Sequence, residues 1–540
     1  MLLSEFYYPI PQRDTPEKKI VYDCEKCGIL QKRALNHAKI SPSIGKSYDG
    51  FVIVPTNPTH EEDIKGILLT SSNGTQLRST AYKAGFNLLD KAAIVPLIRC
   101  AVGKPTDMQG QCCFPELDRV LKELKPKVIV PIGDLPFKYI MHSSHKIPNT
   151  LIRNRLIPNY FYNAIVFPIW NINEIQGKGQ KYLTDATTWD IQRIIGLYQK
   201  RFKARKKVNE FLNSRMILKD ISIRELKTIK EVDQLVDQLN QIGQFSYDYE
   251  TTNVYPYDED FEIITIAFGL EKSAFVIHED FWKGNPNVKI HVLDKVKSLL
   301  VNPKVKKIIQ NSKFEDLGSR LIMGVRWIEN MECTMLASHV IDERAGGTSL
   351  DFQNLIRFGI PPYNQLTEQY LKPKDGARVN RIRECPREEL IHYTGLDVIT
   401  TYNNWHLIDT TLFQSYPKAR ENYEMLRKGH WTYANMQQRG ITLSESECNN
   451  ITKILDDNAT ATLEAIYALP EFIEFNEYMR TKSPKKTKDK QTTMHKLEEK
   501  INASRLRSEL AQPDNRTAGS GISESLRDRI AALKRTVTFQ

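Results

Sequence analysis

Four short, uninterrupted apolar runs in the first third of the chain constrain its fold most strongly. They are FVIV (51–54), AAIVPLI (92–98), KVIVPIG (127–133) and AIVFPI (164–169), and stretches of helical pattern separate them. Continuous apolar strands spaced by helices are typical of a parallel sheet that is buried on both faces. The sequence therefore predicts an open, largely parallel α/β domain over residues 1–190.

A second α/β domain is predicted over residues 217–411. It begins with a helix around 228–242, and three apolar runs follow: QFSYDYET (244–251), EIITIAFGL (262–270) and AFVIHE (274–279). Three strands in such quick succession leave no room for crossover helices, so neighbours must be antiparallel and the sheet is mixed.

Three further segments differ in composition. Residues 191–216 read as a basic linker helix, since six of the eight residues 200–207 are Lys or Arg. This run is either a solvated linker or a phosphate-contacting element that uses Lys206 and Lys207. Residues 412–480 have an all-helical pattern, with Gly440 ending one helix and Ser444 capping the next. Residues 481–540 are charged, and we expect a flexible tail.

The overall charge favours a nucleic-acid partner. The 540 residues contain 76 Lys and Arg against 65 Asp and Glu, a formal net charge of +11. An excess of this kind favours polyanionic partners. The sequence predicts no membrane span and no secretory signal, so we expect a cytoplasmic protein.

Two carboxylates mark the end of the first strand of the second domain. Asp248 and Glu250 are two residues apart, so both side chains project from one face of the sheet. Adjacent carboxylates repel each other unless cations neutralise them. A pair of divalent ions held this way can hydrolyse a phosphodiester.

Two later motifs add to this pair. Residues 311–316 (NSKFED) follow a short apolar strand and enter a helix that would carry Glu315 or Asp316 back toward the sheet. In a later helix, Tyr393 and Asp397 lie one turn apart on one face. A phenol beside a carboxylate can orient the attacking water and help to deprotonate it.

The ordered set DxE, NxKF-acid and YxxxD resembles the three motifs of the DEDDy 3'–5' exonucleases, which have a ribonuclease H-like fold. Its spacing over residues 217–411 resembles the proofreading domain of family A DNA polymerases. The resemblance implies two Mg²⁺ or Mn²⁺ ions held by Asp248, Glu250 and Asp397, with Tyr393 orienting the water. It also makes Thr251, Asn311 and Lys313 candidates for contacting nucleic acid.

The third carboxylate departs from the family pattern. Glu315 stands where the family usually has Asp, and Asp316 follows it. Successive helical residues point about 100° apart, so only one of the two can serve the site. We favour Glu315, because the longer side chain still reaches a metal.

Cysteines cluster near the N-terminus. CEKC supplies Cys24 and Cys27, PLIRC supplies Cys100, and Cys112 and Cys113 follow. Four thiolates can hold a tetrahedral zinc ion or a four-iron cluster, and sparse cysteines can also be structural. Spacing alone leaves these three interpretations open.

The surroundings of these cysteines resemble the iron-sulfur class of uracil-DNA glycosylases over about residues 20–175. The resemblance implies a 4Fe-4S cluster held by Cys24, Cys27, Cys100 and either Cys113 or Cys112, with Cys113 favoured. The family's water-activating acid and its histidine are missing: the corresponding loops read PTNPT (55–59) and FPI (167–169). We therefore expect a DNA-binding or scaffold domain without glycosylase activity.

Together these motifs predict a 3'–5' DNA exonuclease that proofreads for a replicative DNA polymerase. The chain resembles the N-terminal half of a phage-type family A polymerase, and residues 412–480 resemble the start of the polymerase region. The motifs of the polymerase site itself are absent. We expect single-stranded 3' ends and primer-template DNA as partners, a polymerase domain or chain that completes the enzyme, and a phage-infected host cytoplasm. The alternatives are a non-catalytic processivity module and an RNase D-like RNA-trimming nuclease.

Overall fold

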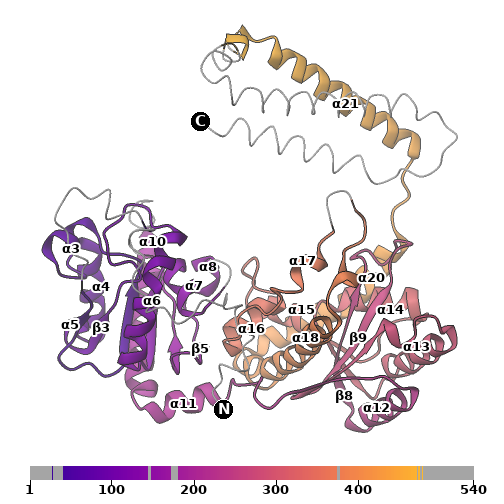
Figure 1. Cartoon of the computed structure of the whole chain (residues 1–540), viewed down its shortest axis with the longest axis horizontal. Coiled ribbons are helices and arrows are strands. Elements are labelled where there is room, and N and C mark those ends of the chain that lie inside the picture. Colours follow the sequence, from indigo (N-terminus) through magenta and orange to yellow (C-terminus); the bar gives the residue numbers. More distant parts are fainter. Residues whose placement is uncertain are drawn as a thin grey trace. The chain divides into compact units, whose positions relative to one another are not determined.

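The computed structural model describes residues 27, 41–143, 147–171, 181–373, 377–470, 472–474 and 477. It is an α/β protein with two mixed six-stranded sheets, followed by C-terminal helices (Figure 1). The predicted fold class is confirmed. The chain divides into two compact units, residues 1–439 and 440–540. Within the described part, none of the helices combines the length and the apolar character needed to cross a bilayer.

The first sheet has the strand order β1-β3-β2-β4-β6-β5. The strands are β1 (Ser43–Ile44), β2 (Phe51–Pro55), β3 (Ala92–Ile94), β4 (Val128–Ile132), β5 (Ile157–Asn159) and β6 (Ala164–Val166). The four central strands are parallel, as predicted, and the two short edge strands are antiparallel.

Both faces of this sheet are buried, which explains its uninterrupted apolar strands. Phe51 and Ile53 of β2 lie in one hydrophobic cluster, and Val52 and Val54 lie in another. The surrounding helices are α3 (His60–Lys65), α4 (Ser72–Lys83), α5 (Leu88–Lys91), α6 (Asp107–Leu124), α7 (Asp134–Ile140), α8 (Asn149–Ile152), α10 (Lys181–Leu197) and α11 (Arg205–Asn213).

The prediction of a basic linker helix over 191–216 is wrong in two respects. The segment is not one helix, because a π-helical turn (Tyr198–Phe202) follows α10 and the extended backbone of Ala204 precedes α11. It is also not a separate linker: it supplies the buried side chains Ile191, Ile194, Ile195, Tyr198, Phe202, Val208, Phe211 and Leu212 to the core of the first domain. Lys206 is exposed, and Lys207 forms an ion pair with Glu210 at 2.7 Å.

The second sheet has the order β12-β11-β8-β9-β10-β7. The strands are β7 (Ser222–Glu225), β8 (Gln244–Thr251), β9 (Ile263–Gly269), β10 (Ser273–His278), β11 (Lys306–Ile309) and β12 (Met331–Cys333). β8, β9 and β10 are antiparallel neighbours, and the remaining pairs are parallel. The predicted mixed sheet is confirmed.

The helices of this second domain are α12 (Ile229–Ile242), α13 (Pro286–Leu300), α14 (Ser312–Met323), α15 (Thr334–Ile341), α16 (Leu350–Phe358), α17 (Glu368–Leu371), α18 (Arg387–Leu407), α19 (Phe413–Ser415) and α20 (Pro417–Arg439). α18 packs across β8, β9 and β10. Ser246 Oγ donates to the carbonyl oxygen of Val398 at 2.6 Å. A Cβ at Gly269 would lie 2.6 Å from the same carbonyl, so this close approach requires glycine.

α16 contacts both α/β domains. Its Phe352, Leu355 and Ile356 lie in a hydrophobic cluster with β5, β6 and α6 of the first domain. Its polar side chains form hydrogen bonds within the second domain, as described below. An ion pair between Arg155 and Asp342 joins the same two domains.

The predicted helix break near residue 440 is confirmed. Gly440 follows α20 with φ of +70°, and Ser444 Oγ caps α21 (Glu445–Tyr467). α20 packs on α14 and α15, so residues 412–439 belong to the first compact unit rather than to a separate helical region. The tail predicted at 481–540 lies outside the described residues.

Candidate active site

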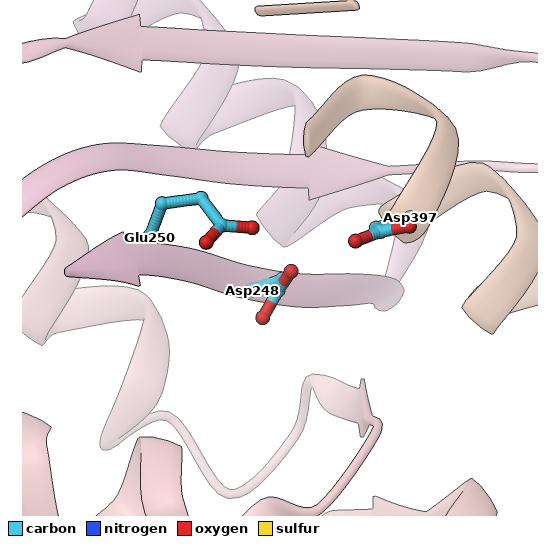
Figure 2. A group of neighbouring side chains, drawn as sticks. All are labelled: Asp248, Glu250 and Asp397. Atoms are coloured by element: carbon cyan, nitrogen blue, oxygen red, sulfur yellow. The ribbon is translucent and has the colours of Figure 1, made fainter. Parts of the chain in front are cut away.

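β8 and α18 bring three carboxylates together. Asp248, Glu250 and Asp397 each have an oxygen within 4.8 Å of the others. Figure 2 shows the two strand residues and the helix residue with their carboxyl groups turned toward one another. The two-residue spacing in β8 places Asp248 and Glu250 on one face, and the packing of α18 on that face adds Asp397.

Burial and mutual repulsion dominate the electrostatics of this cluster. Burial raises the pKa of Asp248 to about 7. Burial, together with the charge of Asp248, raises the pKa of Glu250 to about 8. Burial and both neighbouring charges raise the pKa of Asp397 well above its usual value. Among the described residues no basic side chain forms an ion pair with these three, so their charges are uncompensated.

Glu315 of α14 joins this cluster from another side. Its side chain is only 3% exposed, and it interacts electrostatically with Asp248. Burial and the charge of Asp248 raise the pKa of Glu315 well above its usual value. Its Oε2 has no hydrogen-bond partner within the described part of the chain.

Asp316, the next residue, has a different environment. Its Oδ2 accepts a hydrogen bond from Arg320 Nη2 at 2.6 Å, and its Oδ1 accepts one from the Ile328 N–H at 2.9 Å. The Asp316–Arg320 pair is almost fully buried. Asp316 is a catalytic candidate from the sequence, but its carboxylate is committed to these partners, whereas Glu315 interacts electrostatically with Asp248.

Two tyrosines face Asp397. Tyr393 lies one turn earlier in α18, and burial with the charges of Asp397 and Glu250 raises its pKa well above the usual value. Tyr363, which the sequence analysis missed, donates a hydrogen bond from its OH to Asp397 Oδ1 at 2.5 Å. The two rings are 6.1 Å apart. Tyr363 follows two prolines in an irregular segment, and no spacing signal links it to the other motifs.

The predicted nucleic-acid contacts near the cluster differ in accessibility. Thr251 is buried, and its Oγ1 donates to the carbonyl oxygen of Asn253 at 2.6 Å. Asn311 and Lys313 are exposed at the start of α14, where Asn311 adopts a left-handed conformation with φ of +56°. Exposed donors at this helix start are available to a ligand, while the Thr251 hydroxyl is already engaged.

The predicted cluster of cysteines is only partly described. Cys24 lies outside the described residues. Cys100 and Cys113 are buried in the same hydrophobic cluster, and Cys27 and Cys112 are half-buried. The proposed ligand set therefore stays a prediction.

The loops expected to carry a glycosylase pocket are occupied by structural contacts. Thr56 Oγ1 donates to the carbonyl oxygen of Ile132 at 3.0 Å, and Asn57 Nδ2 donates to that of Val102 at 2.9 Å. Phe167 is fully buried in the core beneath the sheet. None of these three side chains offers an acid or an imidazole.

Two protein families match parts of the chain. Residues 43–209 match the uracil DNA glycosylase superfamily, and residues 223–412 match a family described as 3'-5' exonuclease. No curated protein matches the chain. The chain therefore contains a domain of the glycosylase superfamily followed by a 3'–5' exonuclease domain.

Several solved structures are similar to part of the chain. NrnC of Brucella melitensis with bound Mg²⁺ is 15% identical with a TM-score of 0.30, covering 42% of this chain and 96% of that one. The catalytic core of RRP6 from Trypanosoma brucei is 13% identical with a TM-score of 0.30, covering 41% and 56%. Escherichia coli RNase D is 12% identical with a TM-score of 0.29, covering 39% and 50%. The chain thus spans about half the length of the last two.

Proposed function

We propose that this protein is a 3'–5' exonuclease that removes nucleotides from single-stranded DNA ends with two divalent metal ions. One observation carries this proposal: the carboxyl groups of Asp248, Glu250 and Asp397 converge at one site, the buried Glu315 interacts electrostatically with Asp248, and no basic side chain among the described residues pairs with the three. Burying uncompensated charge is costly, so a site of this kind is built to receive cations.

The residues present fit Mg²⁺ or Mn²⁺. The donor set consists only of carboxylate oxygens, which hard divalent ions prefer. The Oε2 atom of Glu315 lies buried without a partner among the described residues, as expected for a ligand atom. Asp248, Glu250 and Asp397 would hold the ions, with Glu315 completing the set. When bound, such ions activate a water molecule and stabilise the charge that develops on the phosphate.

The chain's own residues supply the remaining chemistry. Tyr393 lies one helical turn from Asp397, where its phenol orients the attacking water by hydrogen bonding. The raised pKa of Tyr393 keeps the phenol protonated at neutral pH, so it acts as a donor. The exposed Asn311 and Lys313 are suited to contact the substrate backbone.

We further propose DNA replication as the setting. The excess positive charge and the preceding glycosylase-superfamily domain both support a DNA substrate. The order of the three motifs supports proofreading for a family A polymerase of phage type whose polymerase site lies in another segment or chain. In this proposal the first domain binds DNA as a scaffold, holds an iron-sulfur cluster or zinc through its cysteines, and excises no base.

The test is the release of mononucleotides from 3'-labelled single strands of DNA and of RNA with the same sequence. Wild-type protein with Mg²⁺ should degrade DNA, and Asp248→Ala or Glu250→Ala should abolish this activity while the protein stays folded. Asp237→Ala, a change at an exposed carboxylate of α12, is the matched control and should be fully active. Undiminished release by Asp248→Ala would overturn the proposal. If RNA is degraded faster than DNA, the proposed substrate is RNA and not DNA.

A further inference from the structure

Tyr363 makes a hydrogen bond that bears directly on the acidic cluster. It lies in the segment between α16 and α17, remote in sequence from the three motifs. Its OH donates to Asp397 Oδ1 at 2.5 Å and lies 3.3 Å from Thr400 Oγ1. The phenol is the donor in this contact, and the carboxyl oxygen of Asp397 accepts.

A second set of hydrogen bonds holds the phenol in place. Asn354 Nδ2 of α16 donates to Tyr363 OH at 3.4 Å. Asn404 Nδ2 of α18 in turn donates to Asn354 Oδ1 at 2.7 Å, and Arg357 Nη1 donates to Asn404 Oδ1 at 2.8 Å. Both asparagines are fully buried. Since Asn354 donates to the phenol oxygen, the phenol hydrogen is directed toward Asp397.

This arrangement addresses a specific difficulty of the site. Without a cation, Asp397 is repelled by Asp248 and Glu250, and a free carboxylate would rotate away from them. The phenol fixes one oxygen of Asp397, so the remaining lone pairs of that carboxylate stay available in the cluster. Partners that orient a metal ligand in this way typically change metal affinity by about 10-fold to 100-fold when they are removed.

We infer that Tyr363 is a positioning residue that holds Asp397 in the geometry required for binding a divalent cation. This inference rests on the proposed function, because it assumes that Asp397 is a metal ligand. It assigns Tyr363 no contact with the substrate or the reacting atoms.

The experiment compares Mn²⁺ binding by wild-type protein and Tyr363→Phe, measured from the electron paramagnetic resonance signal of free Mn²⁺. Phenylalanine keeps the ring that packs near Tyr393 and removes only the hydroxyl. We expect the Kd for Mn²⁺ to rise about 10-fold. The matched control is Tyr402→Phe, which removes a phenol of α18 that accepts a hydrogen bond from Gln244 Nε2 at 2.9 Å and lies outside the acidic cluster. Its Kd should stay at the wild-type value.

Each outcome separates the inference from the proposed function. A wild-type protein that binds no Mn²⁺ and degrades no DNA refutes the proposed function. A wild-type protein that binds Mn²⁺ with the same Kd as Tyr363→Phe refutes the inference alone. If Tyr363→Phe shows no thermal unfolding transition and is therefore not folded, the same measurement is made on Thr400→Val. This variant removes one partner of the Tyr363 phenol. Its Kd must then rise by about 10-fold, the lower end of the range for such orienting partners, and an unchanged Kd overturns the inference.

Discussion

Replacing Asp248 with asparagine should stabilise the metal-free protein while abolishing its nuclease activity. The side chain keeps its shape and loses the charge that burial opposes. The expected gain in the free energy of unfolding depends on pH. At low pH the wild-type Asp248 is already neutral in the folded state, so the substitution removes no charge there.

The size of this effect follows from the pKa of Asp248, which is raised to about 7 in the folded protein. When folding raises the pKa of a carboxyl group, that group contributes its full share to the free energy of unfolding at pH values below its unfolded pKa. The contribution is lost as the pH rises through the folded pKa. Against an unfolded pKa of about 3.9, the loss is roughly 1 to 2 kcal/mol at pH 5 and roughly 4 kcal/mol at pH 8. Protonation of Glu250 and Glu315 offsets part of it, so we expect Asp248→Asn to gain about 2 to 4 kcal/mol at pH 8.

The measurement is guanidinium unfolding in the presence of EDTA at pH 5 and pH 8, followed by tryptophan fluorescence. Asp237→Asn, at an exposed site, serves as the control and should show no difference at either pH. Equal or lower stability of Asp248→Asn at pH 8 would refute the reasoning. A gain that does not shrink at pH 5 would also refute it, because burial of charge would then not be its cause.

Three further predictions concern other parts of the molecule. Asp316→Asn should lower the free energy of unfolding by about 3 kcal/mol, because it leaves the buried Arg320 without its anionic partner; a loss below 1 kcal/mol in the same guanidinium assay would contradict this. Tyr393→Phe should reduce kcat for single-strand degradation about 100-fold and leave the Kd from Mn²⁺ titration unchanged. A loss of both turnover and Mn²⁺ affinity would mean that Tyr393 has a structural role. Protein purified anaerobically should be brown and contain iron and sulfide, whereas a colourless protein with stoichiometric zinc would exclude the cluster.

The parts of the site that lie on regular elements could be predicted from the sequence. The spacing of Asp248 and Glu250 on a strand, and of Tyr393 and Asp397 on a helix, fixes which side chains share a face. The motif spacing alone does not separate Glu315 from Asp316. The sequence does contain a signal for this choice, because Arg320 stands four residues after Asp316 and can pair with it along one helix face.

Other features depend on tertiary contacts that no local pattern reveals. Tyr363 reaches Asp397 from an irregular segment, and its position is set by α16 and its hydrogen bonds. The linker prediction failed for a different reason. Residues 200–207 are rich in Lys and Arg, so their composition suggests a solvated segment. The apolar side chains between and beside them, including Phe202 and Val208, nevertheless pack into the hydrophobic core of the first domain.

The contact of α16 with both α/β domains has a consequence for the ancestry of this chain. If recombination transferred residues 217–411 into another protein, Phe352, Leu355 and Ile356 would arrive there as an uncovered apolar stripe, because their neighbours lie in the first domain. A first domain left behind would lose three side chains from its own interior. Separating the two domains would therefore require mutations that repair both surfaces. This gives a structural reason for retaining the glycosylase-superfamily domain next to the exonuclease domain.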